Sequence, residues 1–206
     1  MFHDRDDAAR QLAEQLLSYR GRNPLILAIP RGAVPMAKII SEKLQGDMDV
    51  VLVRKLGAPG NPEFAIGAID ETGWTYLTQE AERIDNDPHY IETEKQKQLE
   101  VMQLRRKMYT PVRPPCDPAG RVVIVVDDGL ATGSTMIAAL HALRARNPQK
   151  LICAVPVAPP ETLNKVAPLA DEIVCLESPA FFYAVGQFYQ TFQQVSDEEV
   201  IAILEK

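Results

Sequence analysis

Continuous apolar runs alternate along most of the chain with stretches in which apolar residues recur every three or four positions. The continuous runs are typical of strands buried on both faces, and the periodic stretches are typical of amphipathic helices. The pattern predicts strands at 24–30, 49–56, 64–70, 74–77, 122–126, 151–158 and 172–176, and helices at 9–17, 31–44, 133–146 and 161–166. Strands that alternate with helices favour right-handed crossovers. We therefore expect an α/β fold with a mostly parallel sheet flanked by helices.

The segment 79–118 breaks this alternation because its composition turns polar. It predicts one long helix over 89–109 and then a proline-rich exit, TPVRPPCDP. We interpret the segment as a helical insertion within a single domain that spans 1–206. The apolar residues of this helix could pack over a site or against a second subunit, which leaves a homodimer open. These residues are Ile91, Leu99, Met102 and Tyr109.

Composition limits the classes of function. Of the 206 residues, 46% are hydrophobic, which is enough for one sizeable core, and the net charge of -6 argues against nucleic acid as a partner. The chain has a charged start and no apolar run of about 20 residues, so we expect a cytoplasmic protein without a membrane partner. The three cysteines are widely separated, which indicates neither a disulfide framework nor a zinc site.

The stretch VVIVVDDGLATGST, 122–135, carries the clearest candidate chemistry. The carboxyl ends of parallel strands open onto the ligand crevice, so Asp127 and Asp128 fall at a site position. The small and hydroxyl residues that follow offer backbone amides near a helix N-terminus, which suits a phosphate dianion. Carboxylates instead suit sugar hydroxyls, or a magnesium ion reached directly or through water. The stretch favours a sugar phosphate over the alternative, a capped helix with the acids as turn formers.

Two other phosphate-binding motifs are absent from this stretch. A nucleotide P-loop needs GxxxxGK[ST], and no lysine precedes Ser134 or Thr135. The dinucleotide fingerprint GxGxxG does not occur either. The absence of both motifs therefore leaves little support for a nucleotide-binding alternative.

The same stretch resembles the phosphoribosyl-diphosphate (PRPP) signature of the type I phosphoribosyltransferases. The resemblance implies that Asp127 and Asp128 bind the ribose hydroxyls and, directly or through water, a Mg²⁺ cofactor. It implies that the following loop binds the 5-phosphate through Ala131, Thr132, Gly133, Ser134 and Thr135. Gly129 departs from the pattern, because the family usually has a bulky aliphatic residue there.

Two earlier segments resemble the same family in the right order. AIPRGAVP is similar to its diphosphate loop, which implies that Arg31 and Gly32 bind diphosphate and that a non-proline cis peptide joins Pro30 to Arg31. VRKLGAPGNPEFAIG is similar to its strand and mobile loop, which implies that Arg54 and Lys55 lie near diphosphate and that 57–63 forms a lid. An ordinary turn and a plain surface loop remain alternatives for these two segments.

The segment FFYAVGQFYQTF, 181–192, resembles the C-terminal segment of the purine transferases. It implies a small hood in which Tyr183, or else its neighbour Phe182, stacks on the acceptor ring. An aromatic cluster fits a core equally well. The whole pattern is most similar to uncharacterised phosphoribosyltransferase-like proteins that are sometimes fused to an α/β hydrolase.

The resemblance implies a magnesium-dependent pentosyltransferase, as in nucleotide salvage, whose partners are PRPP and a small nitrogenous acceptor. It would transfer the 5-phosphoribosyl group to the acceptor and release diphosphate, with Arg31, Lys55, Asp127 and Asp128 as the catalytic residues. The 6-oxopurine transferases have an aspartate at the position of Ala131, so hypoxanthine and guanine are disfavoured. The alternative is a regulator of the same fold that senses PRPP without turning it over.

Overall fold

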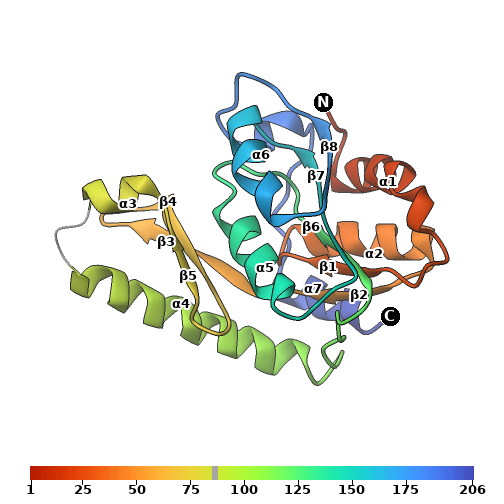
Figure 1. Cartoon of the computed structure of the whole chain (residues 1–206), viewed down its shortest axis with the longest axis horizontal. Helices are drawn as coiled ribbons and strands as arrows, with labels where there is room; N and C mark the ends of the chain where they lie inside the picture. The colour runs from red at the N-terminus through yellow and green to blue at the C-terminus, as the bar shows by residue number, and fades with distance from the viewer. Residues whose placement is uncertain (85–87) are drawn as a thin grey trace.

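The computed structural model describes residues 1–84 and 88–206, and at 63, 82–84 and 88 it describes the backbone only. Its larger sheet has five parallel strands in the order β2-β1-β6-β7-β8 (Figure 1). These strands are β1 Leu25–Ala28, β2 Asp47–Val50, β6 Val122–Val126, β7 Lys150–Val157 and β8 Glu172–Glu177. The expected α/β fold with a parallel sheet is thus confirmed.

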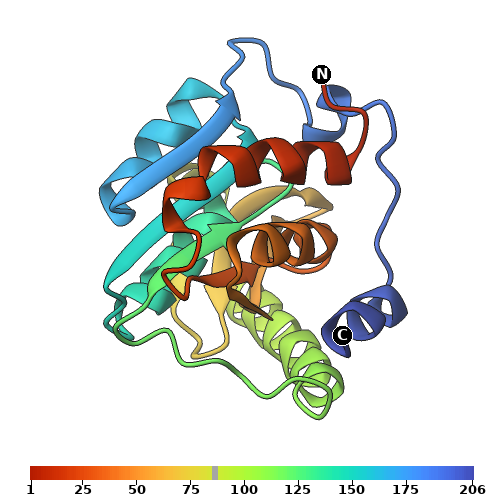
Figure 2. The same cartoon turned by 90° about the vertical axis from the view of Figure 1, so that its right-hand side faces the viewer.

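Helices cover both faces of this sheet (Figure 2). Strand β6 is apolar throughout because both of its faces are buried. Ile124 packs with the helices α1 and α2 in one core, whereas Val123 and Val125 pack with α5 in another. The helices are α1 Arg5–Gln15, α2 Ala33–Leu44, α5 Ser134–Arg144 and α6 Pro160–Val166, with short 3-10 turns η1 Leu17–Tyr19 and η2 Ala167–Leu169.

A second, antiparallel sheet contains β3 Val53–Ala58, β4 Asn61–Asp70 and β5 Thr75–Leu77. The prediction of one strand over 49–56 was wrong, because the chain leaves the parallel sheet after Val50 and enters the antiparallel one at Val53. Val51 and Leu52, between the two strands, are buried, so no polar residue marks the change of sheet.

The predicted lid, 57–63, lies at the turn between β3 and β4. Only Pro59 and Gly60 separate the two strands, and the pairing register shifts between Leu56 and Ala58. The segment is therefore the tip of a β-hairpin rather than an irregular loop.

The segment 79–118 contains α3 Gln79–Ile84 and α4 Pro88–Tyr109, which confirms the long helix. Helix α4 runs along the antiparallel sheet (Figure 1) and buries Met102 and Tyr109 within its own chain. The C-terminal helix α7, Asp197–Leu204, packs against both α2 and α4. Helices α4 and α7 thereby join the two sheets.

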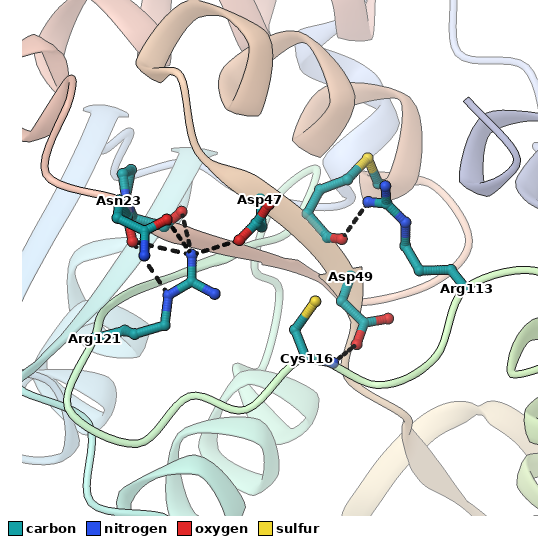
Figure 3. Close-up of polar contacts among 8 residues, drawn as sticks. Asn23, Asp47, Asp49, Arg113, Cys116 and Arg121 are labelled. Carbon is teal, nitrogen blue, oxygen red and sulfur yellow. Dashed lines mark hydrogen bonds and ion pairs between the residues drawn. The ribbon is translucent and has the colours of Figure 1, made fainter.

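The proline-rich exit returns along β2, the edge strand of the parallel sheet (Figure 3). The buried Asp49 carboxylate accepts the Cys116 N–H at 2.8 Å, and Arg113 donates to the Met48 carbonyl at 2.8 Å. Arg121 donates to the Asp47 carboxylate at 2.8 Å. These contacts cover a strand edge that would otherwise expose unpaired backbone groups.

Candidate functional site

Two adjacent carboxylates stand where β6, the central strand of the parallel sheet, ends. Asp128 N–H donates to Asp127 Oδ1 at 2.9 Å. Burial, together with the negative charge of Asp128, raises the pKa of Asp127 well above its usual range. Burial also raises the pKa of Asp128, against the opposing effect of the Arg5 guanidinium. The fold therefore holds two adjacent carboxylates in a setting that disfavours their charge.

Arg5, at the start of α1, is a site residue that the sequence reasoning missed. Its Nε and Nη2 donate to Asp128 Oδ2 at 2.9 and 2.8 Å, and both side chains are largely buried. Its guanidinium also lies 3.9 Å from the centre of the Phe192 ring. One signal could have found it, since a basic residue in the first turn of a helix opposes the helix dipole and calls for another explanation.

The predicted phosphate loop leads into α5. Gly133 takes the N-cap position with φ of +79° and has no side chain to accept hydrogen bonds from the first helical turn. The hydroxyls of Thr132 and Ser134 lie 3.1 Å apart, and Thr162 Oγ1 donates to the Ala131 carbonyl at 2.6 Å. A glycine-capped helix start beside two hydroxyls is a suitable environment for an anion.

One cavity of about 410 Å³ brings several predicted site residues together. The loop 128–135 forms one side, and Lys55, Phe64, Ala65 and Val185 complete the lining. Lys55 comes from β3 of the other sheet, so the cavity lies between the two sheets. A cation, a carboxylate and the predicted phosphate loop thus line the same cavity.

The structure also explains the departure at Gly129. A Cβ atom built there would lie 2.6 Å from Val185 Cγ1 and 3.0 Å from Val157 Cγ1, too close for any side chain. The C-terminal segment that carries Val185 packs on this loop as the small hood. The Val185 side chain lies against the Gly129 backbone.

The predicted diphosphate loop contains the expected cis peptide between Pro30 and Arg31. A Cβ atom at Gly32 would lie 2.2 Å from Asp128 Oδ2, so the loop backbone passes against the acid pair. The Arg31 side chain turns elsewhere, and its Nη1 lies 3.5 Å from Asp197 Oδ2 on α7. The Gly32 backbone therefore lies beside the acid pair, whereas the Arg31 side chain pairs with Asp197.

Arg54 and Lys55 are neighbours on β3 and therefore point to opposite faces of the strand. Lys55 lines the cavity, whereas Arg54 Nε donates to Gln98 Oε1 on α4 at 2.8 Å. Burial lowers the pKa of Arg54, and the nearby charges of Arg105 and Arg31 act in the same direction. The structure does not bring both predicted cations to the same side of β3.

The C-terminal aromatic residues divide into two groups. Tyr183 is 89% exposed and, with the partly buried Phe182, lines a hollow that shares Ala131 and Thr132 with the main cavity. Phe182 packs against Phe188 of the 3-10 turn η3, Val185–Phe188, with ring centres 5.0 Å apart. Tyr189 is buried and donates from its hydroxyl to the Asp128 carbonyl at 2.6 Å. Tyr183 is thus available to a ligand, and Tyr189 supports the acid pair.

Comparisons with known proteins agree with this geometry. Residues 2–192 match the family model described as "Phosphoribosyl transferase domain". Two curated proteins of Mycobacterium tuberculosis, each named "Putative phosphoribosyl transferase", are 42% identical over 207 residues. The match covers 100% of this chain and 47% of each relative, so the chain spans about half the length of these relatives.

A similar solved structure is the crystal structure of TT1426 from Thermus thermophilus. It has 45% sequence identity and a TM-score of 0.81, and the match covers 99% of this chain and 97% of that one. Among the described residues, no helix is long and apolar enough to cross a membrane.

Proposed function

Because this chain belongs to the phosphoribosyltransferase family, we propose that it transfers the 5-phosphoribosyl group of PRPP to a nitrogenous acceptor and releases diphosphate. One observation carries the proposal: Lys55, Asp128 and the loop 131–135 line the same cavity although they come from two sheets. A sugar phosphate with a charged leaving group needs these three kinds of partner at once.

The acid pair and the loop would hold the substrate before the reaction. Carboxylate oxygens of Asp127 and Asp128 accept hydrogen bonds from the ribose hydroxyls, and Arg5 fixes the orientation of Asp128. The first amides of α5 and the hydroxyls of Thr132 and Ser134 bind the 5-phosphate. With both ends held, the sugar carbon that reacts is fixed in position.

In the transfer step, the bond from C1 of ribose to the diphosphate oxygen breaks, and a bond from C1 to the acceptor nitrogen forms. The bonding electron pair leaves with diphosphate, which can also take the proton that the nitrogen loses. Lys55 stabilises the charge that grows on the leaving group, and the backbone at Gly32 offers a further contact. Closure of the hairpin tip, 57–63, would exclude water.

Magnesium fits this site as an ion shared with the substrate. In the described part of the chain, no group of three or more His, Cys, Asp and Glu side chains forms a metal site. Mg²⁺ commonly keeps several waters and is held by one or two carboxylates together with phosphate oxygens, a role open to Asp127 and Asp128. When bound, it would neutralise charge on the diphosphate.

The acceptor would bind beside the phosphate loop, in the hollow lined by Tyr183 and Phe182. Alanine at 131 offers no proton-exchanging group, which disfavours the 6-oxopurines. An exposed tyrosine ring stacks on many planar rings, so the hollow favours a heteroaromatic base but discriminates weakly among bases.

Turnover of PRPP with a panel of nucleobases and other amines, followed as diphosphate release in the presence of magnesium, tests this proposal. We expect release with at least one acceptor and a loss of about a hundredfold in Lys55→Ala. Lys165→Ala, on α6, is the matched control and should keep full activity. PRPP binding without release for any acceptor would instead favour the sensor.

A further inference from the structure

A cluster of charged side chains lies between α2, α4 and α7, beside the predicted diphosphate loop. Asp197, the first residue of α7, accepts a hydrogen bond from Tyr109 Oη at 2.5 Å. Its carboxylate also lies 3.4 Å from Arg105 Nε and 3.5 Å from Arg31 Nη1. Two neighbouring side chains of α4 and one from the distant segment at 31 thus converge on one carboxylate.

Positive charge is in excess at this cluster. Arg54 lies close enough to Arg105 and Arg31 for their charges to contribute to its lowered pKa, after burial. Two further acids lie near these arginines. Glu94 is matched by Lys97 at 3.6 Å and accepts a hydrogen bond from Gln98. Glu198 is exposed, and its pKa is lowered by hydrogen bonds and, less strongly, by the charge of Arg31. Two guanidinium groups, those of Arg31 and Arg105, therefore share one carboxylate, Asp197, and an anion of higher charge would balance them better.

The cluster also borders the reaction site. Arg31 precedes Gly32, whose backbone stands against Asp128, so the loop that carries Arg31 touches the ribose-binding acid. Arg105 is only 12% exposed, which makes its charge sparingly solvated and its contact with an anion correspondingly strong. Guanidinium groups bind phosphate oxygens with two hydrogen bonds at once, more effectively than they bind one shared carboxylate.

We propose that Arg105 of α4 joins Arg31 as a diphosphate-binding group, and that Asp197 is an internal carboxylate which pairs with both arginines until diphosphate displaces it. The inference rests on the proposed function, since it extends the diphosphate site. In this arrangement α4 takes a direct part in substrate binding, and the Asp197 carboxylate of α7 competes with diphosphate for the arginines.

Displacement of Asp197 need not unfold α7. The helix is held independently by its buried Val200 and Leu204 and by the hydrogen bonds between Ser196 and Glu199. Asp197 lies in the first turn, where a small shift of the chain moves its carboxylate away from Arg31 and Arg105. The exchange replaces one anion with another, so the arginines remain paired throughout.

Titration calorimetry with inorganic diphosphate tests the inference in the full chain. Asp197→Asn should bind diphosphate about tenfold more tightly than the wild type, because the competing charge is removed. Arg105→Gln should bind it at least about tenfold more weakly, the usual effect of losing a hydrogen bond between charged groups. The matched controls are Glu205→Gln at the C-terminal end of α7 and Lys107→Gln on α4, which should bind like the wild type.

Tyr109→Phe gives a second, conservative variant, because it removes the hydrogen bond to Asp197 while it keeps the ring in the core. It should tighten diphosphate binding severalfold. Ribose 5-phosphate binding should be unchanged in every variant, since its contacts lie at 127–135. Unchanged diphosphate affinity in Arg105→Gln, or weaker binding in Asp197→Asn, would overturn the inference.

The same titrations separate this inference from the proposed function. If the wild type binds ribose 5-phosphate but diphosphate affinity does not depend on Arg105, only the inference fails. If the wild type binds neither ribose 5-phosphate nor diphosphate, both proposals fail.

Discussion

Arg5 and Asp128 lie 123 positions apart in the sequence, and two nitrogens of the Arg5 guanidinium donate to the same Asp128 carboxylate oxygen at 2.9 and 2.8 Å. The first helix of the chain therefore fixes an acid that follows the central strand. The side chains are only 13% and 16% exposed, so each charge depends on the other for its partner.

Loss of Arg5 should cost both stability and ligand affinity. Arg5→Ala leaves a buried carboxylate without its partner, and we expect the free energy of unfolding to fall by about 3 kcal/mol. Urea unfolding measures this, and PRPP titration should show weaker binding. Arg10→Ala is the control, because Arg10 forms an exposed ion pair with Asp6 and should cost less than about 1 kcal/mol. An Arg5→Ala loss no larger than that of the control would refute the structural role.

Asp49 should make stability depend on pH. Burial raises its pKa in the folded protein above the unfolded value of about 3.9. Between those two values the native state binds more protons than the unfolded chain, so the free energy of unfolding falls as pH rises. Relative to Asp49→Asn, the wild type should therefore lose stability from about pH 4 upward until the folded pKa is passed. Urea unfolding of both proteins across about pH 4–8 measures the difference, and a constant difference contradicts the prediction.

Gly129 should tolerate no side chain while Val185 stands against it. The Cβ atom of Gly129→Ala would lie 2.6 Å from Val185 Cγ1, and we expect the free energy of unfolding to fall by about 2 kcal/mol. Val185→Ala removes that methyl group and should recover part of the loss. A double-mutant cycle by thermal unfolding measures the coupling. Additive effects would show that the hood does not pack on the loop as described.

Tyr183 should affect the acceptor and not PRPP. Because the ring is 89% exposed, Tyr183→Ala should leave thermal stability unchanged but raise the KM of the acceptor about three- to tenfold, the effect of one lost stacking contact. Phe181→Ala is the control, because Phe181 is nearby and similarly exposed, at 82%. Equal loss of acceptor and PRPP affinity would instead make Tyr183 a structural residue.

The sequence was most informative where local pattern determines structure. The run 122–126 predicts a strand buried on both faces, and Asp127 and Asp128 follow it directly, so strand and site position could be predicted together. The break between β2 and β3 could not, because the apolar run continues across it while the chain changes sheets. Periodicity reports burial and does not report which sheet a strand joins.

Contacts between distant segments were beyond local pattern for a similar reason. A basic residue at the start of α1 marks Arg5 as unusual, but the sequence does not indicate that Arg5 meets Asp128 or that Asp197 meets Arg31, since these pairings depend on how α1 and α7 pack. The separation of Arg54 from Lys55 was predictable in principle, because neighbours on a strand point to opposite faces. The resemblance to the family assigned both residues to one ligand, and the strand geometry divides them.

Titration calorimetry of PRPP against the wild type and the double variant Asp128→Asn, Thr132→Ala tests the central claim most directly. The two changes remove the proposed ribose contact and the proposed phosphate contact from the same cavity. We predict binding to the wild type and a loss of at least about a hundredfold in the variant. The control, Asp6→Asn with Thr93→Ala, makes the same chemical changes at exposed positions and should bind normally. Equal PRPP affinity in the wild type and the Asp128→Asn, Thr132→Ala variant would contradict the assignment of this cavity.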